Sequence, residues 1–151
     1  MRWSGFVLAV ALLVSLHFAL RPVWVSWTVA PDFLLCAALL AARRVRAGTA
    51  AGIGFALGLL EDALAVTRFG LAALVFTGIS YLGARTRDVF LGDEPLFLAG
   101  YLFVGKWAAD LALQIGAGTG SWLGLGVWAP LSALATAVVG VLVSAAVPAP
   151  R

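Results

Sequence analysis

Charged residues are scarce in this sequence, and so are the side chains that most metal sites and disulfides require. Only 11% of the 151 residues are charged, and the chain has one histidine and one cysteine. His17 and Cys36 alone cannot supply the Cys/His cluster of a zinc site, and one cysteine cannot form an internal disulfide. We interpret Cys36 as a small buried hydrophobe and His17 as an interfacial hydrogen-bonding residue.

Sequence motifs of intramembrane or nucleotide-dependent enzymes are also missing. Serine catalysis needs a histidine base, and Ser80 lacks the glycine pattern that surrounds such a nucleophile. Asp62 is not preceded by the Gly-x-Gly of intramembrane aspartyl proteases. The glycines follow helix-packing spacing rather than a phosphate-binding pattern. We therefore expect no enzyme, no cofactor and no metal site.

The sequence is instead dominated by apolar blocks. Hydrophobic residues make up 63% of the chain and the mean hydropathy is +1.05, too apolar for a soluble domain. Helices of about 20 residues cross the ~30 Å of a bilayer core, and the second and fourth blocks are short for that. We predict an all-α, polytopic membrane protein with six transmembrane helices in a single transmembrane domain, residues 1–151. The six blocks are 3–20, 32–42, 48–64, 70–84, 96–115 and 122–147.

Arginine placement predicts the topology. The net charge is +3 and the pI about 9.8, but the arginines cluster in alternate gaps and at the termini, so nucleic-acid binding is not needed to explain them. The positive-inside rule then places both termini in the cytoplasm, with the first block retained rather than cleaved. Trp24, Trp27, Trp122 and Trp128 fit an outer aromatic belt. The inner set is Arg2, Arg43, Arg44, Arg46, Arg85, Arg87 and Arg151, against Arg21 and Arg68 outside.

Small residues recur at intervals of four in two blocks, a spacing that lets helix backbones approach closely. Whether these faces meet another helix of the same chain or a partner protein stays open at this point. The third block has Gly48, Gly52 and Ala56 on one face, and Ala50, Gly54 and Gly58 on another. The sixth block has the stripe Ser132, Thr136, Gly140 and Ser144.

Several charged residues fall inside the apolar blocks. Lys106 lies ~16 Å from the start of its helix, near the bilayer centre, and Asp110 follows one turn later. Asp62 is expected at a similar depth, and Asp32 enters from the outer side. Because an unpaired charge in hydrocarbon is costly, we expect an intramembrane charge network in which Lys106 pairs with Asp110, Asp62 or both. Proton transfer could use such a network, but a structural lock is the simpler role.

The order of short motifs between residues 31 and 87 resembles the rod shape-determining protein MreD family. Residues 31–35 (PDFLL) open the second block, a basic turn follows, and residues 54–62 (GFALGLLED) precede residues 68–70 (RFG). The resemblance implies that the family aspartate corresponds to Asp62 and the family glycine to Gly70. It also implies a fold similar to the six-helix substrate-binding subunits of energy-coupling-factor vitamin transporters.

The same resemblance implies a role in bacterial cell elongation. It implies a non-enzymatic inner-membrane protein, surrounded by membrane lipid, that binds the bitopic protein MreC and influences peptidoglycan synthesis and cell shape. MreB filaments, the RodA glycosyltransferase and a class B penicillin-binding transpeptidase are the other expected members of the complex. The alternative function is vitamin capture by a transporter subunit. That alternative is disfavoured because Ala9, Ala11 and Ala19 do not form the Ala-x-x-x-Ala coupling face.

Overall fold

The computed structural model describes residues 3–24, 29–64, 69–90 and 94–146, and helices are the only regular secondary structure in these ranges. The prediction of an all-helical protein is therefore confirmed for those residues. The expected residues Arg2, Trp27, Arg68 and Arg151 lie outside them. The elements are α1 (Trp3–Trp24), α2 (Phe33–Ala42), α3 (Ala47–Leu64), α4 (Leu71–Thr86), the 3-10 turn η1 (Arg87–Phe90), α5 (Pro95–Ala117), the π-helical turn η2 (Gly124–Trp128) and α6 (Ala129–Ala146).

Local sequence explains where several helices begin and end. The Asp32 side chain caps α2 by accepting a hydrogen bond from the Leu35 backbone N–H at 3.0 Å. Pro95 occupies the first turn of α5, where its missing N–H costs nothing. Gly118 ends α5 in the left-handed conformation, with φ +64°.

Four of the described helical segments are long and apolar enough to cross a membrane: α1, α3, α5 and η2 with α6. By contrast, α2 has only 10 residues and α4 has 16. The second and fourth apolar blocks, which are short for a full membrane span, therefore correspond to helices that are themselves short. Most of α1 faces outward, since 11% of its apolar span is buried inside the bundle. An apolar helix with so little buried surface belongs in lipid.

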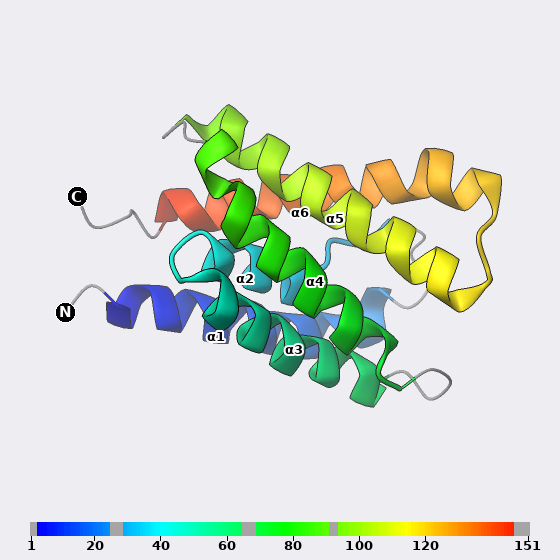
Figure 1. Ribbon diagram of the computed structural model, residues 1–151, viewed down its shortest axis with the longest axis horizontal. Coiled ribbons are helices and arrows are strands. Elements are labelled where there is room, and N and C mark those ends of the chain that lie inside the picture. Colours follow the sequence, from blue (N-terminus) through cyan, green and yellow to red (C-terminus); the bar gives the residue numbers. More distant parts are fainter. Residues whose placement is uncertain (1–2, 25–28, 65–68, 91–93, 147–151) are drawn as a thin grey trace.

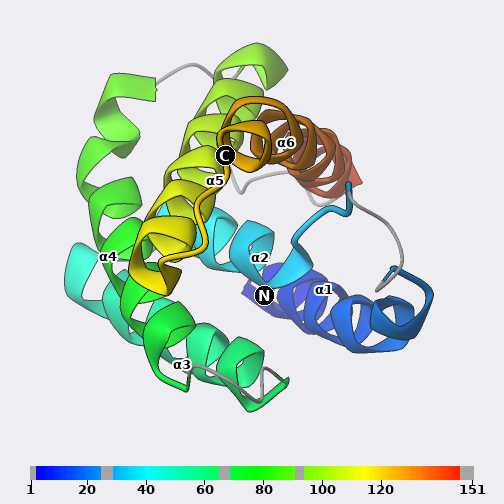
Figure 2. The same ribbon diagram turned by 90° about the vertical axis from the view of Figure 1, so that its right-hand side faces the viewer.

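The short helix α2 forms the centre of the bundle. All ten of its residues are buried, and it contacts α1, α3, α4, α5 and α6, which surround it in Figure 2. Its sequence, FLLCAALLAA, is apolar on every side, which is typical of a helix covered all round. Because its neighbours are longer, α2 can end inside the bundle without exposing its backbone to lipid.

One end of the bundle carries the arginine-rich turns, and we call it the basic end. Figure 1 shows the start of α1, the end of α6, the α2–α3 turn and the end of α4 together there. Arg87 donates hydrogen bonds to the carbonyl oxygens of Arg43 at 3.4 Å and Val45 at 3.0 Å. This contact joins the two arginine-bearing turns and satisfies two carbonyl groups in the turn after α2.

Three of the described tryptophans, Trp24, Trp122 and Trp128, lie toward the opposite end. The Trp24 ring stacks on Phe33, with ring centroids 5.2 Å apart, so it packs against the start of α2. Trp122 is 93% exposed at the start of the η2–α6 segment, and Trp128 is partly exposed. Exposed indole rings at one end of an apolar bundle are typical of a membrane interface.

Candidate functional site

A buried ion cluster lies between α5 and the start of α2. The Lys106 amine is 3.4 Å from Oδ2 of Asp32 and in direct contact with Oδ1 of Asp110. The Lys106 side chain is 8% exposed and each carboxylate 16%. Lys106 and Asp110 are one turn apart on α5, whereas Asp32 comes from the N-terminus of α2. The cluster therefore joins two helices that are distant in the sequence.

Of the two carboxylates expected to pair with Lys106, Asp110 does so, whereas Asp62 lies outside this cluster. Its Oδ1 accepts a hydrogen bond from the Ala72 N–H at 3.0 Å, and its Oδ2 accepts one from the Ala73 N–H at 2.8 Å. These N–H groups belong to the first turn of α4, where helix N–H groups lack backbone acceptors and the dipole favours an anion. Asp62 is only 2% exposed, so its carboxylate is buried. Backbone N–H groups, rather than a cation, stabilise this buried carboxylate.

Gly70 shapes the turn that presents these N–H groups. It precedes α4 with φ +101°, in the left-handed region that other residues adopt only with strain. No atom lies within 4 Å of the position a Cβ would take there. The requirement for glycine at this position is therefore conformational, and Gly70 is not a packing contact.

Glu61, the neighbour of Asp62, faces another helix. Its Oε2 lies 2.9 Å from Nε2 of His17, and its Oε1 lies 3.4 Å from Nη1 of Arg21. Both partners come from the second half of α1. Adjacent residues on α3 therefore connect it to two helices, with Glu61 facing α1 and Asp62 facing α4. Sequence reasoning did not assign a partner to Glu61, and only the basic residues late in α1 could have indicated one.

Gly54 and Gly58 bring α3 and α4 into backbone contact. A Cβ at Gly54 would collide with the Phe76 carbonyl oxygen, and one at Gly58 would collide with the backbone of Ala73. Together with Asp62, these glycines form a line at intervals of four along α3, which we call the α3–α4 seam. The close approach allows the short Asp62 side chain to reach the first turn of α4.

The polar stripe of α6 faces α2 of the same chain. The Ser132 hydroxyl donates to the Ala30 carbonyl at 2.9 Å, and the Thr136 hydroxyl accepts from the Asp32 N–H at 3.0 Å. A Cβ at Gly140 would collide with the Leu102 side chain and lie 3.1 Å from the sulfur of Cys36. Three members of this stripe thus pack within the chain, against α2, the segment before it and α5, rather than facing a partner. The fourth, Ser144, lines a cleft near the basic end.

Asp32 links these contacts into one network. Its backbone N–H binds α6, its Oδ1 caps α2 and its Oδ2 faces Lys106 of α5. Across the described ranges, no three His, Cys, Asp or Glu side chains are grouped so that they could hold a metal ion. The arrangement is suited to fixing helices relative to one another.

The comparisons with known proteins identify the family. No curated protein and no solved structure matches the chain. The vitamin-transporter alternative has no finding in its support. The model of one family, described as rod shape-determining protein MreD, matches residues 1–144. That match covers almost the whole chain, including α1, the α3–α4 seam and the Lys106 cluster. The chain therefore belongs to the MreD family of rod shape-determining membrane proteins.

Proposed function

We propose that this protein is a non-enzymatic inner-membrane component of the bacterial elongation complex, which binds MreC and influences peptidoglycan synthesis. The observation that carries the proposal is the family match over residues 1–144. MreB filaments, RodA and a class B penicillin-binding transpeptidase are the other proposed members of the complex. In this proposal the protein acts through helix contacts and carries out no chemical step.

The proposed role of the buried charges is structural. Lys106 pairs with Asp32 and Asp110, while Asp62 binds the first turn of α4. Each buried carboxylate is thus occupied by a partner in the same chain. Lys106 and its carboxylates neutralise one another, so the cluster needs no transported ion. The helices that it fixes offer partner proteins a constant surface. This supports a scaffold better than a transporter or an enzyme.

We further propose a single transmembrane domain of six helices with both chain termini in the cytoplasm. The ten residues of α2 extend only ~15 Å, about half of the ~30 Å bilayer core. Its burial among five longer helices supports a place inside the bundle. The arginines of the basic end support a cytoplasmic orientation.

Complementation combined with co-purification tests this proposal. Cells of a rod-shaped bacterium that lack their own MreD protein should regain rod shape when they express this chain together with its cognate MreC. MreC should co-purify with it in mild detergent. Normal shape without any retention of MreC would contradict the proposed binding, and retention without restored shape would contradict the proposed role.

Cysteine labelling tests the orientation separately. Arg46 is exposed in the α2–α3 turn, so a cysteine introduced there should report the side of the membrane. In a Cys36→Ser background, Arg46→Cys should resist a membrane-impermeant thiol reagent in intact cells and react after permeabilisation. Trp122→Cys, at the opposite end, should react in intact cells. The reverse pattern would show that the orientation is wrong.

A further inference from the structure

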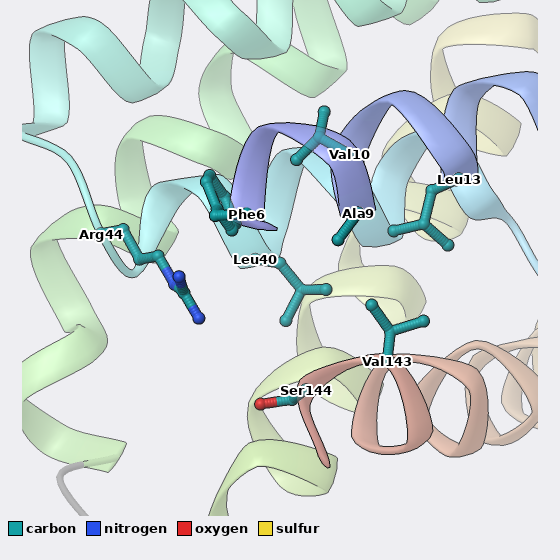
Figure 3. Close-up of a pocket in the computed structure, with 8 residues that line it drawn as sticks. All are labelled: Phe6, Ala9, Val10, Leu13, Leu40, Arg44, Val143 and Ser144. Carbon is teal, nitrogen blue, oxygen red and sulfur yellow. The ribbon is translucent and has the colours of Figure 1, made fainter. Parts of the chain in front are cut away.

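A cleft opens between α1 and α6 above the buried helix α2. Its apolar walls come from Ala9, Val10 and Leu13 of α1, Leu40 of α2 and Val143 of α6 (Figure 3). The empty space in the cleft and at its open mouth is about 290 Å³. Because α1 and α6 are apolar and long enough to cross a membrane, we expect this cleft to open to lipid rather than to water.

The basic end of the cleft carries hydrogen-bond donors. The Arg44 guanidinium lies over the ring of Phe6, 4.4 Å from its centroid. Figure 3 shows Arg44 and the Ser144 hydroxyl at the same end, with the apolar side chains extending away from them. A guanidinium and a hydroxyl together can donate several hydrogen bonds to one anion.

Arg44 lacks an acidic partner in the described part of the chain, where the ion pairs involve other residues. Its neighbours at the basic end are engaged elsewhere, since Arg43 lies over the Tyr101 ring and Arg87 binds carbonyl oxygens. Burial, followed by the charge of Arg43, lowers the pKa of the Arg44 guanidinium. An anion beside the guanidinium would oppose both effects, because it stabilises the charged form.

We propose that this cleft binds an anionic phospholipid, with the phosphate on Arg44 and Ser144 and one acyl chain along Val10, Leu13 and Val143. The cleft is basic and polar at one end and apolar along the rest of its length, which matches the anionic headgroup and the apolar chain of such a lipid. Basic pockets between transmembrane helices on the cytoplasmic side favour acidic headgroups. The bound lipid would fill the gap between α1 and α6 and so hold α1 against the bundle.

The shape of the cleft favours an acyl chain over a partner helix. The cleft is shallow, because most of the space in it is open at its mouth. An acyl chain is only a few ångströms wide and can follow the groove along its length, whereas an α-helix, about 10 Å wide, could only rest on the rim.

Lipid retention by the purified full-length protein tests the proposal. We expect native mass spectrometry in mild detergent to show phosphatidylglycerol bound in preference to phosphatidylcholine. Arg44→Gln should lower phosphatidylglycerol retention about fivefold or more, the loss expected for one cation near an anionic lipid. Arg46→Gln is the matched control, because Arg46 is exposed in the same turn and does not line the cleft, so retention should stay at the wild-type level.

Two further variants separate the headgroup from the chain. Ala9→Phe fills the apolar part of the cleft and should lower retention of phosphatidylglycerol while leaving Arg44 in place. Arg44→Lys keeps the charge and should retain more lipid than Arg44→Gln. The melting temperature in lipid-free detergent shows whether each variant folds. If Arg44→Gln does not fold, Ala9→Phe and Arg44→Lys carry the test.

Several results would overturn the proposal. Equal losses for Arg44→Gln and Arg46→Gln would indicate general charge attraction. Inorganic phosphate protecting the protein against unfolding as well as phosphatidylglycerol would indicate an anion site without a lipid chain. Loss of MreC with unchanged lipid retention in Arg44→Gln would indicate a protein helix at the cleft. Because lipid retention is measured on the isolated protein, it does not depend on the proposed elongation complex.

Discussion

The two buried acidic sites keep carboxylates away from lipid with different kinds of partner. Asp62 is held by two backbone N–H groups at the start of α4, the next helix in the chain. Asp32 and Asp110 are held by the Lys106 amine, which joins α5 to the more distant α2. The first site is local to one helical hairpin, while the second fixes the central helix within the bundle. Their loss should therefore differ in reach as well as in size.

The largest effect is expected from Lys106→Ala. It leaves Asp32 and Asp110 close together and without their cation, and breaking a buried ion pair in this way costs about 3–5 kcal/mol. Unfolding in detergent, followed by circular dichroism, should show this loss. The control is Lys106→Met with Asp32→Asn and Asp110→Asn, which removes all three charges and should recover part of the stability. Wild-type stability of Lys106→Ala alone would show that the cluster is not a structural lock.

Asp62→Ala should have the second largest effect. It leaves the Ala72 and Ala73 N–H groups buried without acceptors, which costs about 2–3 kcal/mol by the usual penalty for unsatisfied groups. Asp62→Asn keeps one acceptor oxygen and should cost about 1 kcal/mol. Increased hydrogen exchange confined to the start of α4 is the expected signature. Exchange that spreads to α2 would contradict the view that this site is local.

The sequence predicted the helices and the contact of Lys106 with Asp110, but it did not predict the partner of Asp62. The apolar blocks lie close to the observed helices because composition alone fixes which segments avoid water. Lys106 and Asp110 are one turn apart, so their contact follows from helix geometry. Asp62 was one of the two carboxylates expected to pair with Lys106, yet its donors are backbone groups that no residue type reveals. Gly70, which precedes α4, was the sequence signal for the turn that presents these N–H groups.

Spacing alone also could not show which small face of α3 is covered. Gly52 and Gly58 both belong to rows with intervals of four, and the two rows look equivalent in the sequence. Only the path of α4 decides between them, and that path depends on the turn at Gly70 and on the Asp62 contact. Long-range packing of this kind is a property of the folded bundle rather than of any one segment.

The smallest expected effect comes from a matched pair of substitutions on these two faces. Gly58→Ala places a methyl group against the Ala73 backbone, separates α3 from α4 and lengthens the Asp62 hydrogen bonds; overpacking of this kind costs about 1–3 kcal/mol. Gly52→Ala meets no atom within 4 Å, so it should be neutral or stabilise the helix by up to about 1 kcal/mol. Unfolding of both variants in the same detergent measures the difference.

In cells, a Gly52→Ala protein that is stable but loses MreC would identify the open face as a partner contact. Equal destabilisation of the two variants in detergent would show that the α3–α4 seam does not hold Asp62 in place.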